Sequence, residues 1–197
     1  FKQRVYQNFV GSTLAEIAEI IVRSVEEAEK PDASRLPGYH DSELPSLEFR
    51  LFSQAPIYPN REEHLIAGFL EAAKQELGSD DWFVRTVLDN RSPEETAAHL
   101  VRNTELANVE FRRELVAGGT AAVVASTDPL ITMMRQLDPQ RREAEETFRQ
   151  SVESVLEDSG ATLARARFSA FGRAVYPDAT FTPRLAYGTV KGYPMNG

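Results

Sequence analysis

The sequence predicts a mainly α-helical fold that ends in a short β segment. Up to residue 160, capping residues alternate with apolar residues at helical spacing, as after Ser92-Pro93. Beyond it, glycines become frequent and apolar residues fall roughly on the period of two that is typical of a strand, at Phe181, Leu185, Tyr187 and Val190. We therefore expect a helical domain over 1–160 and a transition to the first strand or strands of another domain over 161–197.

Composition excludes several classes of protein. The 197 residues are 42% hydrophobic and 26% charged, which is ordinary for a soluble globular domain. The net charge of −8 argues against a nucleic-acid binder, and the absence of cysteine excludes thiol catalysis, disulfides and thiolate metal sites. No apolar run approaches the roughly 18 residues of a membrane span. Because the chain begins at Phe1 without an initiator methionine or a signal peptide, we expect it to be a piece of a larger precursor.

The first 52 residues leave two alternatives open. Thr13 followed by Glu16 fits a capping box that would begin a helix after Gly11, but one unbroken helix through Gly11 fits nearly as well. The prolines and glycine between residues 31 and 45 indicate a loop. The segment 47–52 is ambiguous between helix and strand.

The middle of the chain carries clearer signals, and we expect helices over 60–77, 79–88, 92–102 and 108–117. Asn60 can cap the first of these helices and Gly78 can end it. Ser92 and Glu95 have the spacing of a capping box with a proline between them. The last of the four helices should stop at Gly118-Gly119, which lack the lysine and spacing of a phosphate-binding loop.

An aspartate followed by a proline occurs twice, at Asp128-Pro129 and Asp138-Pro139. Both units have the form of a helix start, with a capping side chain before a proline at the first helical position. We expect the second unit to open a long helix that runs to about Ser159 and stops at Gly160. The two units are ten residues apart, which is too short a period for a solenoid repeat.

No arrangement of side chains in the sequence predicts a catalytic, metal or cofactor site. The three histidines, His40, His64 and His99, form no metal-binding motif, and we interpret them as structural or solvent-exposed. No serine lies in a Gly-x-Ser-x-Gly turn, although triads also assemble from distant residues. Adjacent acidic residues such as Glu145-Glu146 fit a solvated helix face. We therefore assign no catalytic residue, no metal ligand and no cofactor, and the substrate-binding residues stay unknown.

Three runs resemble a known family. These runs are RNTELANVEFRRELVAGGTAAVVAS, TDPLITMMRQLDPQRREAEETFRQSVESVL and RFSAFGRAVYPDATFTPRLAYGTVKGY. They are similar to segments of the bacterial dipeptidyl-peptidase 7 and dipeptidyl-peptidase 11 family, periplasmic serine exopeptidases that remove dipeptides from peptide N-termini. The likeness is clearest over the last half of the chain and weaker before Asn60. Pro183 departs from it, because the family usually has an apolar residue there.

The resemblance implies a chymotrypsin-like double β-barrel peptidase with a helical domain inserted over the active site. The chain would then be that helical cap plus the strand that returns to the barrel. The resemblance implies that the parent is a hydrolase. The family's Gly-Gly-Asn-Ser-Gly-Ser nucleophile segment is missing from this sequence, so we expect this fragment alone to be inactive. The resemblance also implies a peptide substrate, a homodimeric parent and a periplasmic location. Tyr176-Pro177-Asp178 fits a structural turn between helix and strand. The alternative is that Tyr176 or Asp178 faces the substrate cleft.

A hypothesis from another class is a stand-alone acidic helical module that binds other proteins without catalysis. The strand-like, basic tail argues against it, because an independent module has no use for a strand without ladder partners. Barrel sequence on both sides of this segment in the gene would favour the cap domain.

Overall fold

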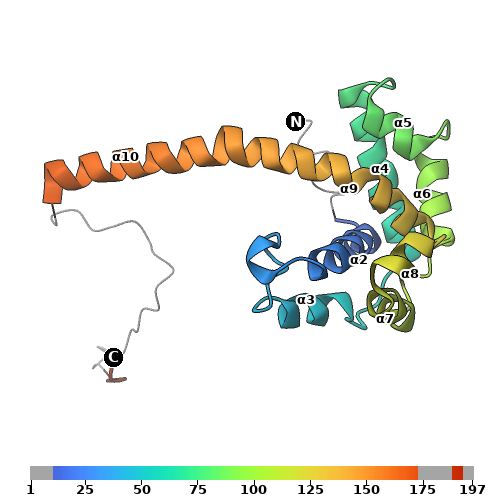
Figure 1. Ribbon diagram of the computed structural model, residues 1–197, viewed down its shortest axis with the longest axis horizontal. Helices are drawn as coiled ribbons and strands as arrows, with labels where there is room; N and C mark the ends of the chain where they lie inside the picture. Colours follow the sequence, from blue (N-terminus) through green and yellow to red (C-terminus); the bar gives the residue numbers. More distant parts are fainter. Residues whose placement is uncertain (1–10, 173–187, 193–197) are drawn as a thin grey trace, which may run out of the picture. The chain divides into compact units, whose positions relative to one another are not determined.

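The computed structural model describes residues 11–172 and 188–192 (Figure 1). Its regular structure is helical throughout, with no strand in either of these ranges, so the mainly α class is confirmed. The chain divides into two units, Phe1–Ser151 and Val152–Gly197. Most of the strand predicted over 181–190 lies outside the described residues, and so do Tyr176-Pro177-Asp178 and Pro183. The division of the chain at residue 160 stays a prediction.

The first unit is built from short and medium helices. They are α2 (Thr13–Ala28), the 3-10 turn η1 (Asp32–Ser34), α3 (Leu44–Leu51), α4 (Pro59–Leu77), α5 (Trp82–Leu88), α6 (Pro93–Arg102), α7 (Val109–Ala117), α8 (Gly119–Ala125) and α9 (Pro129–Phe148). A π-helical turn, Arg149–Glu153, crosses into the second unit, where α10 spans Ser154–Phe171.

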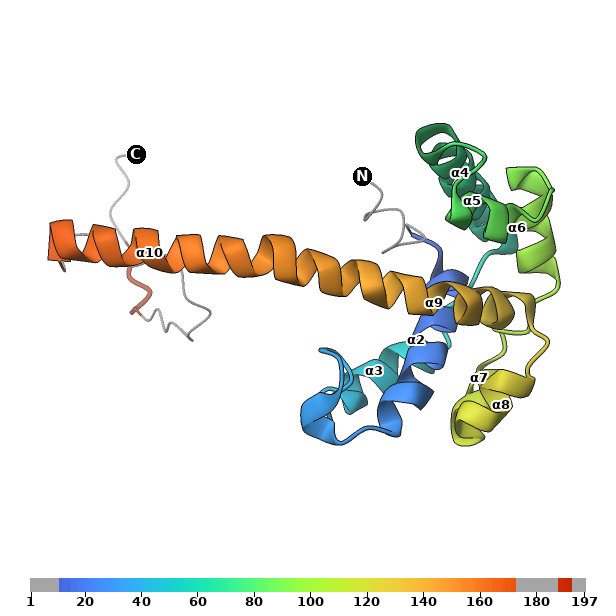
Figure 2. The same ribbon diagram turned by 45° about the horizontal axis from the view of Figure 1, so that its top comes forward.

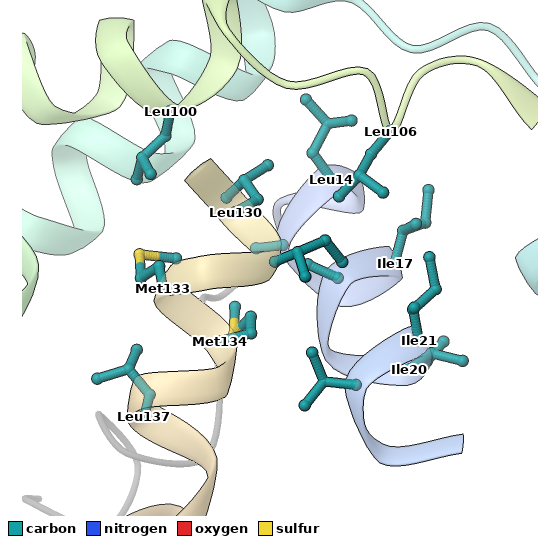
Figure 3. Close-up of a cluster of buried hydrophobic side chains, with 14 of the residues drawn as sticks. Leu14, Ile17, Ile20, Ile21, Leu100, Leu106, Leu130, Met133, Met134 and Leu137 are labelled. Carbon is teal, nitrogen blue, oxygen red and sulfur yellow. The ribbon is translucent and has the colours of Figure 1, made fainter. Parts of the chain in front are cut away.

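Helix α2 lies at the centre of the first unit. It packs against α7, α8 and α9, while α4 packs against α5 and α6, and α6 reaches α9 (Figures 1 and 2). Apolar side chains of α2 and α9 face one another across the core, joined by Leu100 of α6 and Leu106 of the loop after it (Figure 3). Burial of this surface is the main source of stability for helices this short, because isolated helices below about 12–15 residues are marginal in water.

The start of α2 is capped by the adjacent Ser12 and also contacted by a carboxylate from α4. Ser12, one residue before the expected Thr13, is the cap: its Oγ accepts a hydrogen bond from the backbone N–H of Ala15 at 3.1 Å. The same hydroxyl donates to Glu62 Oε2 at 2.8 Å, and that oxygen also accepts from the N–H of Leu14 at 3.1 Å. The predicted helix after Gly11 is therefore confirmed, but the predicted Thr13 cap is wrong. The acidic group at this end comes from α4, and Glu62 is fully buried there.

Other predicted caps divide into confirmed and wrong ones. Ser92 and Glu95 form the predicted capping box, with Ser92 Oγ accepting from the N–H of Glu95 and Glu95 Oε2 from that of Ser92. Gly78 ends α4 with φ 86°, a backbone angle that glycine adopts without strain. Asn60 is not a cap, because α4 already begins at Pro59, whose fixed φ suits the first helical position. The ambiguous segment 47–52 belongs mainly to α3.

The predicted helix start at Asp138 is wrong. Asp128 is the cap of α9, accepting from the N–H groups of Leu130 and Ile131, and the helix continues through Pro139. The carboxylate of Asp138 instead accepts hydrogen bonds from arginine side chains of α2 and α9. These bonds stabilise a conformation that a residue before proline usually avoids.

The predicted stop at Gly160 is also wrong. Gly160 lies inside α10, which continues to Phe171 and ends at Gly172 with φ 54°. A glycine inside an exposed helix costs about 1 kcal/mol relative to alanine, which weakens a helix without forcing it to end.

Candidate functional site

The three histidines lie in local contacts or at the surface. His40 Nδ1 lies 2.9 Å from the carbonyl oxygen of Asp32, and His99 Nδ1 lies 3.3 Å from the side-chain amide of Asn103. His64 is exposed on α4. In the part of the chain that the structure describes, none of the three is hydrogen-bonded to a serine, and no cluster of histidine and acidic side chains could hold a metal ion.

The most highly organised polar feature is a buried ion network between α2 and α9. Arg23, on the face of α2 that looks toward α9, is 7% exposed. Its Nε lies 2.6 Å from Asp138 Oδ1, its Nη2 lies 2.9 Å from Glu145 Oε1, and its Nη1 lies 3.3 Å from Glu19 Oε1. Arg141 Nη2 binds the same Glu19 oxygen at 2.8 Å. Two arginines and three carboxylates thus neutralise one another where water has little access.

Glu27 extends the network toward the end of α2. Its side chain is 1% exposed and accepts hydrogen bonds from Lys30 Nζ at 2.7 Å, from the N–H of Leu36 at 2.9 Å and from Arg142. Arg142 also binds Asp138 and, at 3.1 Å, Glu26 Oε2. The network therefore ties the loop after α2 to the last turns of α9.

The pKa values record this pairing. Burial alone would raise the pKa of Glu27, but the hydrogen bonds from Lys30, Arg142 and the N–H of Leu36 outweigh it and lower the pKa to about 2. Burial alone would lower the pKa of Arg23, but the carboxylates of Glu145, Asp138 and Glu19 raise it above its ordinary value. Both groups are therefore charged at neutral pH.

A second buried cation, Arg112 on α7, is held by carbonyl groups. Its guanidinium donates to Leu51 O at 2.9 Å and Ser53 O at 3.1 Å, just beyond the end of α3, and also to the carbonyls of Leu106 and Ala107. Burial lowers its pKa. Carbonyl dipoles at a helix C-terminus attract a cation, so Arg112 joins α3, α7 and the loop before α7.

A polar cleft of about 700 Å³ lies between the end of α4, α5 and the turn that leads to α6. Its wall combines cations (Lys74, Arg85, Arg91), carboxylates (Asp80, Asp89) and the indole of Trp82. The side chains of Lys74 and Arg85 have no ion-pair or hydrogen-bond partner among the described residues. Asp89 and Asn90, which also line the cleft, have left-handed backbone angles with φ 44° and 64°. This cleft has room for a ligand, and a smaller hollow of about 310 Å³ lies between Asn103, Phe111 and Ser126.

In the second unit, α10 has no buried residue. Its large apolar side chains are exposed, among them Leu156, Leu163, Phe168 and Phe171. None of the helices within 11–172 is both long enough and apolar enough to cross a membrane.

A sequence model of the family described as Peptidase S46 matches residues 1–197. The chain belongs to the peptidase S46 family. A comparison with curated proteins found no match. The family resemblance stated from the sequence is therefore confirmed at the level of an S46 peptidase, a hydrolase of peptide bonds.

The sequence predicted neither the ion network between α2 and α9, nor the carbonyl contacts of Arg112, nor the cleft beside Trp82. The ion network has a signal in hindsight: Glu19, Arg23 and Glu27 follow one another at spacing four on α2, so they share one face. Their partners on α9 lie more than a hundred residues away, and no local pattern connects the two sets. No local sequence pattern predicts the site of Arg112, because its partners are backbone carbonyl groups. The cleft likewise has no sequence pattern, because it depends on how helices and turns are arranged.

Proposed function

We propose that this chain is the helical domain of a periplasmic serine dipeptidyl-peptidase, positioned over the active-site cleft of the parent enzyme. The observation that carries the proposal is the match of the S46 family to all 197 residues. The helical character of the described residues and the lack among them of a histidine bonded to serine support it. In this reading, the catalytic triad lies on the β-barrels and residues 161–197 lead back to them.

The parent would hydrolyse peptide bonds through a serine acyl-enzyme. A histidine and an aspartate would activate the serine, and an oxyanion hole would stabilise the tetrahedral intermediate. The helical domain would block the active-site cleft on the N-terminal side of the substrate. The cleft would then hold a dipeptide with a free N-terminus but no further residues before it. The helical domain can exclude longer substrates only if it is rigid.

The first unit has the construction that a rigid domain requires. The buried ion network joins α2 to α9 through four ion pairs, and Arg112 fixes α3 to α7 through four carbonyl groups. Directional bonds of this kind hold helices in one arrangement, whereas apolar contacts alone permit sliding.

The test compares the isolated chain with a full-length parent enzyme. We expect the parent to release dipeptides from reporters with a free N-terminus and to reject the same reporters when N-acetylated, and we expect the isolated chain to release none. A parent that lacks the residues corresponding to 1–160 should lose the discrimination between free and acetylated reporters. Turnover by the purified chain, or full discrimination without the helical domain, would contradict the proposal.

A further inference from the structure

We propose that the cleft between α4, α5 and the turn before α6 is a peptide-binding site that recognises a carboxylate. The inference rests on the proposed function in taking a peptide as the ligand. It adds a second contact point for that peptide, on the helical domain and with its own chemistry. The observation behind it is the pair of unpartnered cations, Lys74 and Arg85, that line a hollow of about 700 Å³.

The two cations are exceptional within the first unit. Most other arginines there bind carboxylates or carbonyl groups, as Arg23, Arg102 and Arg112 do. Lys74, which is half-buried, and Arg85, which is exposed, in contrast line the cleft without a partner among the described residues. Arg91 adds a third positive charge, held only loosely by Asp89 at 3.8 Å with both side chains exposed. A carboxylate that enters the cleft therefore meets cations that need give up no existing strong bond.

The remaining wall favours a peptide over a phosphorylated ligand. Asp80 and Asp89 stand beside the cations and would repel a multiply charged phosphate. The same carboxylates accept hydrogen bonds from the N–H groups of a peptide backbone, and the Asn90 side chain can both donate and accept. A ligand with one negative charge and many amide donors suits this mixture, and the protein's net charge of −8 further disfavours polyanions.

Trp82 supplies the apolar part of the site. It lies at the start of α5 and lines the cleft together with the buried side chains of Val84 and Leu88. A flat aromatic surface beside polar groups is a common contact for peptide side chains. The cleft volume falls within the roughly 300–1,000 Å³ of small-ligand sites, which is room for a few peptide residues.

The site carries its own reporter, because Trp82 is the single tryptophan of the chain. The 197-residue chain is titrated with four short peptides while its fluorescence and heat of binding are followed. Ala-Glu-Ala-amide and Ala-Gln-Ala-amide test a side-chain carboxylate, whereas Ala-Ala-Ala as free acid and as amide tests a C-terminal one. We expect saturable binding of at least one carboxylate peptide and none of its uncharged counterpart.

The double variant Lys74→Gln/Arg85→Gln should weaken that binding by about tenfold or more, since a hydrogen bond to a charged group contributes about 1.5–3 kcal/mol. Arg50→Gln is the matched control, because Arg50 is an exposed arginine of α3 outside the cleft. It should leave binding unchanged.

The proposal is overturned if no peptide gives a saturable signal in either measurement, or if the double variant binds as well as the wild type. Inorganic phosphate that binds more tightly than every peptide would overturn the assignment to peptides. Because the titration needs no hydrolysis, its failure leaves the proposed dipeptidyl-peptidase function standing. An inactive parent enzyme would equally leave a positive titration intact.

Discussion

Helices α2 and α10 are of similar length, 16 and 18 residues, yet they are stabilised in opposite ways. Ten residues of α2 are buried, including Arg23 and Glu27, whereas α10 buries none. α2 is helical because its apolar face packs against α7, α8 and α9. The contacts that the structure describes for α10 include its backbone hydrogen bonds and local side-chain contacts, such as Arg165 Nε to Ala161 O at 3.2 Å. The comparison separates helix stabilised by the tertiary fold from helix stabilised by local sequence.

The sharpest test of this comparison removes one charge from each helical region. Asp138→Ala deprives the buried Arg23 and the half-buried Arg142 of their shared carboxylate, so it should lower the free energy of unfolding by about 3–5 kcal/mol. Glu157→Ala on exposed α10 should change it by less than about 0.5 kcal/mol. Urea unfolding followed by Trp82 fluorescence and by circular dichroism measures both. Equal effects of the two substitutions would mean that the network contributes no more than a surface charge.

An apolar pair repeats the test without charge. Leu137 in α9 is fully buried, and Leu137→Ala should cost about 2–5 kcal/mol through lost burial and the cavity left behind. Leu163 in α10 is 66% exposed, so Leu163→Ala should be nearly neutral. The same urea experiments apply. A large loss from Leu163→Ala would show that α10 has a packing partner in solution.

Acid should weaken the first unit through Glu27. The pKa of Glu27 is about 2 when folded, against 4.5 ordinarily. A carboxylate with a lowered folded pKa contributes stability above its unfolded pKa, and this contribution disappears as the pH falls through the folded value. The stability difference between wild type and Glu27→Gln should therefore be full at pH 7 and shrink steadily between about pH 4.5 and 2. Unfolding curves at pH 7, 4.5, 3 and 2 measure it, and a constant difference would contradict the assigned hydrogen bonds.

The smallest expected effect concerns α10 alone. A Cβ added at Gly160 meets no atom within 4 Å, so Gly160→Ala should stabilise α10 by about 0.5–1 kcal/mol. Gly78→Ala is the contrasting variant, because its φ of 86° strains any other residue and should make the substitution unfavourable. Amide hydrogen exchange over 156–166 should slow in the first variant. Unchanged exchange there would mean that α10 is limited by something other than propensity.

Local sequence signals predicted the fold class and several helix boundaries. They failed where the structural role of a residue depends on partners that are distant in the sequence. Ser92, Asn108 and Asp128 each cap the helix that follows, because a cap is made by a side chain and a backbone amide two or three residues apart. Asp138-Pro139 has the same local pattern as Asp128-Pro129 but a different role, since its carboxylate is bound by Arg23 from 115 residues away. For the same reason the sequence predicted neither the ion network nor the cleft beside Trp82.

The contact between Ser12 and Glu62 bears on the order in which the molecule can assemble. The buried carboxylate that serves the first turn of α2 belongs to α4, so that turn is complete only after a loop of about fifty residues has closed. Closing such a loop carries an entropic cost that precedes any gain from the contacts it permits. The central helix of the first unit should thus gain its N-terminal end late in folding. Cutting the chain between α2 and α4 would then slow the return of that end far more than the return of α4 itself.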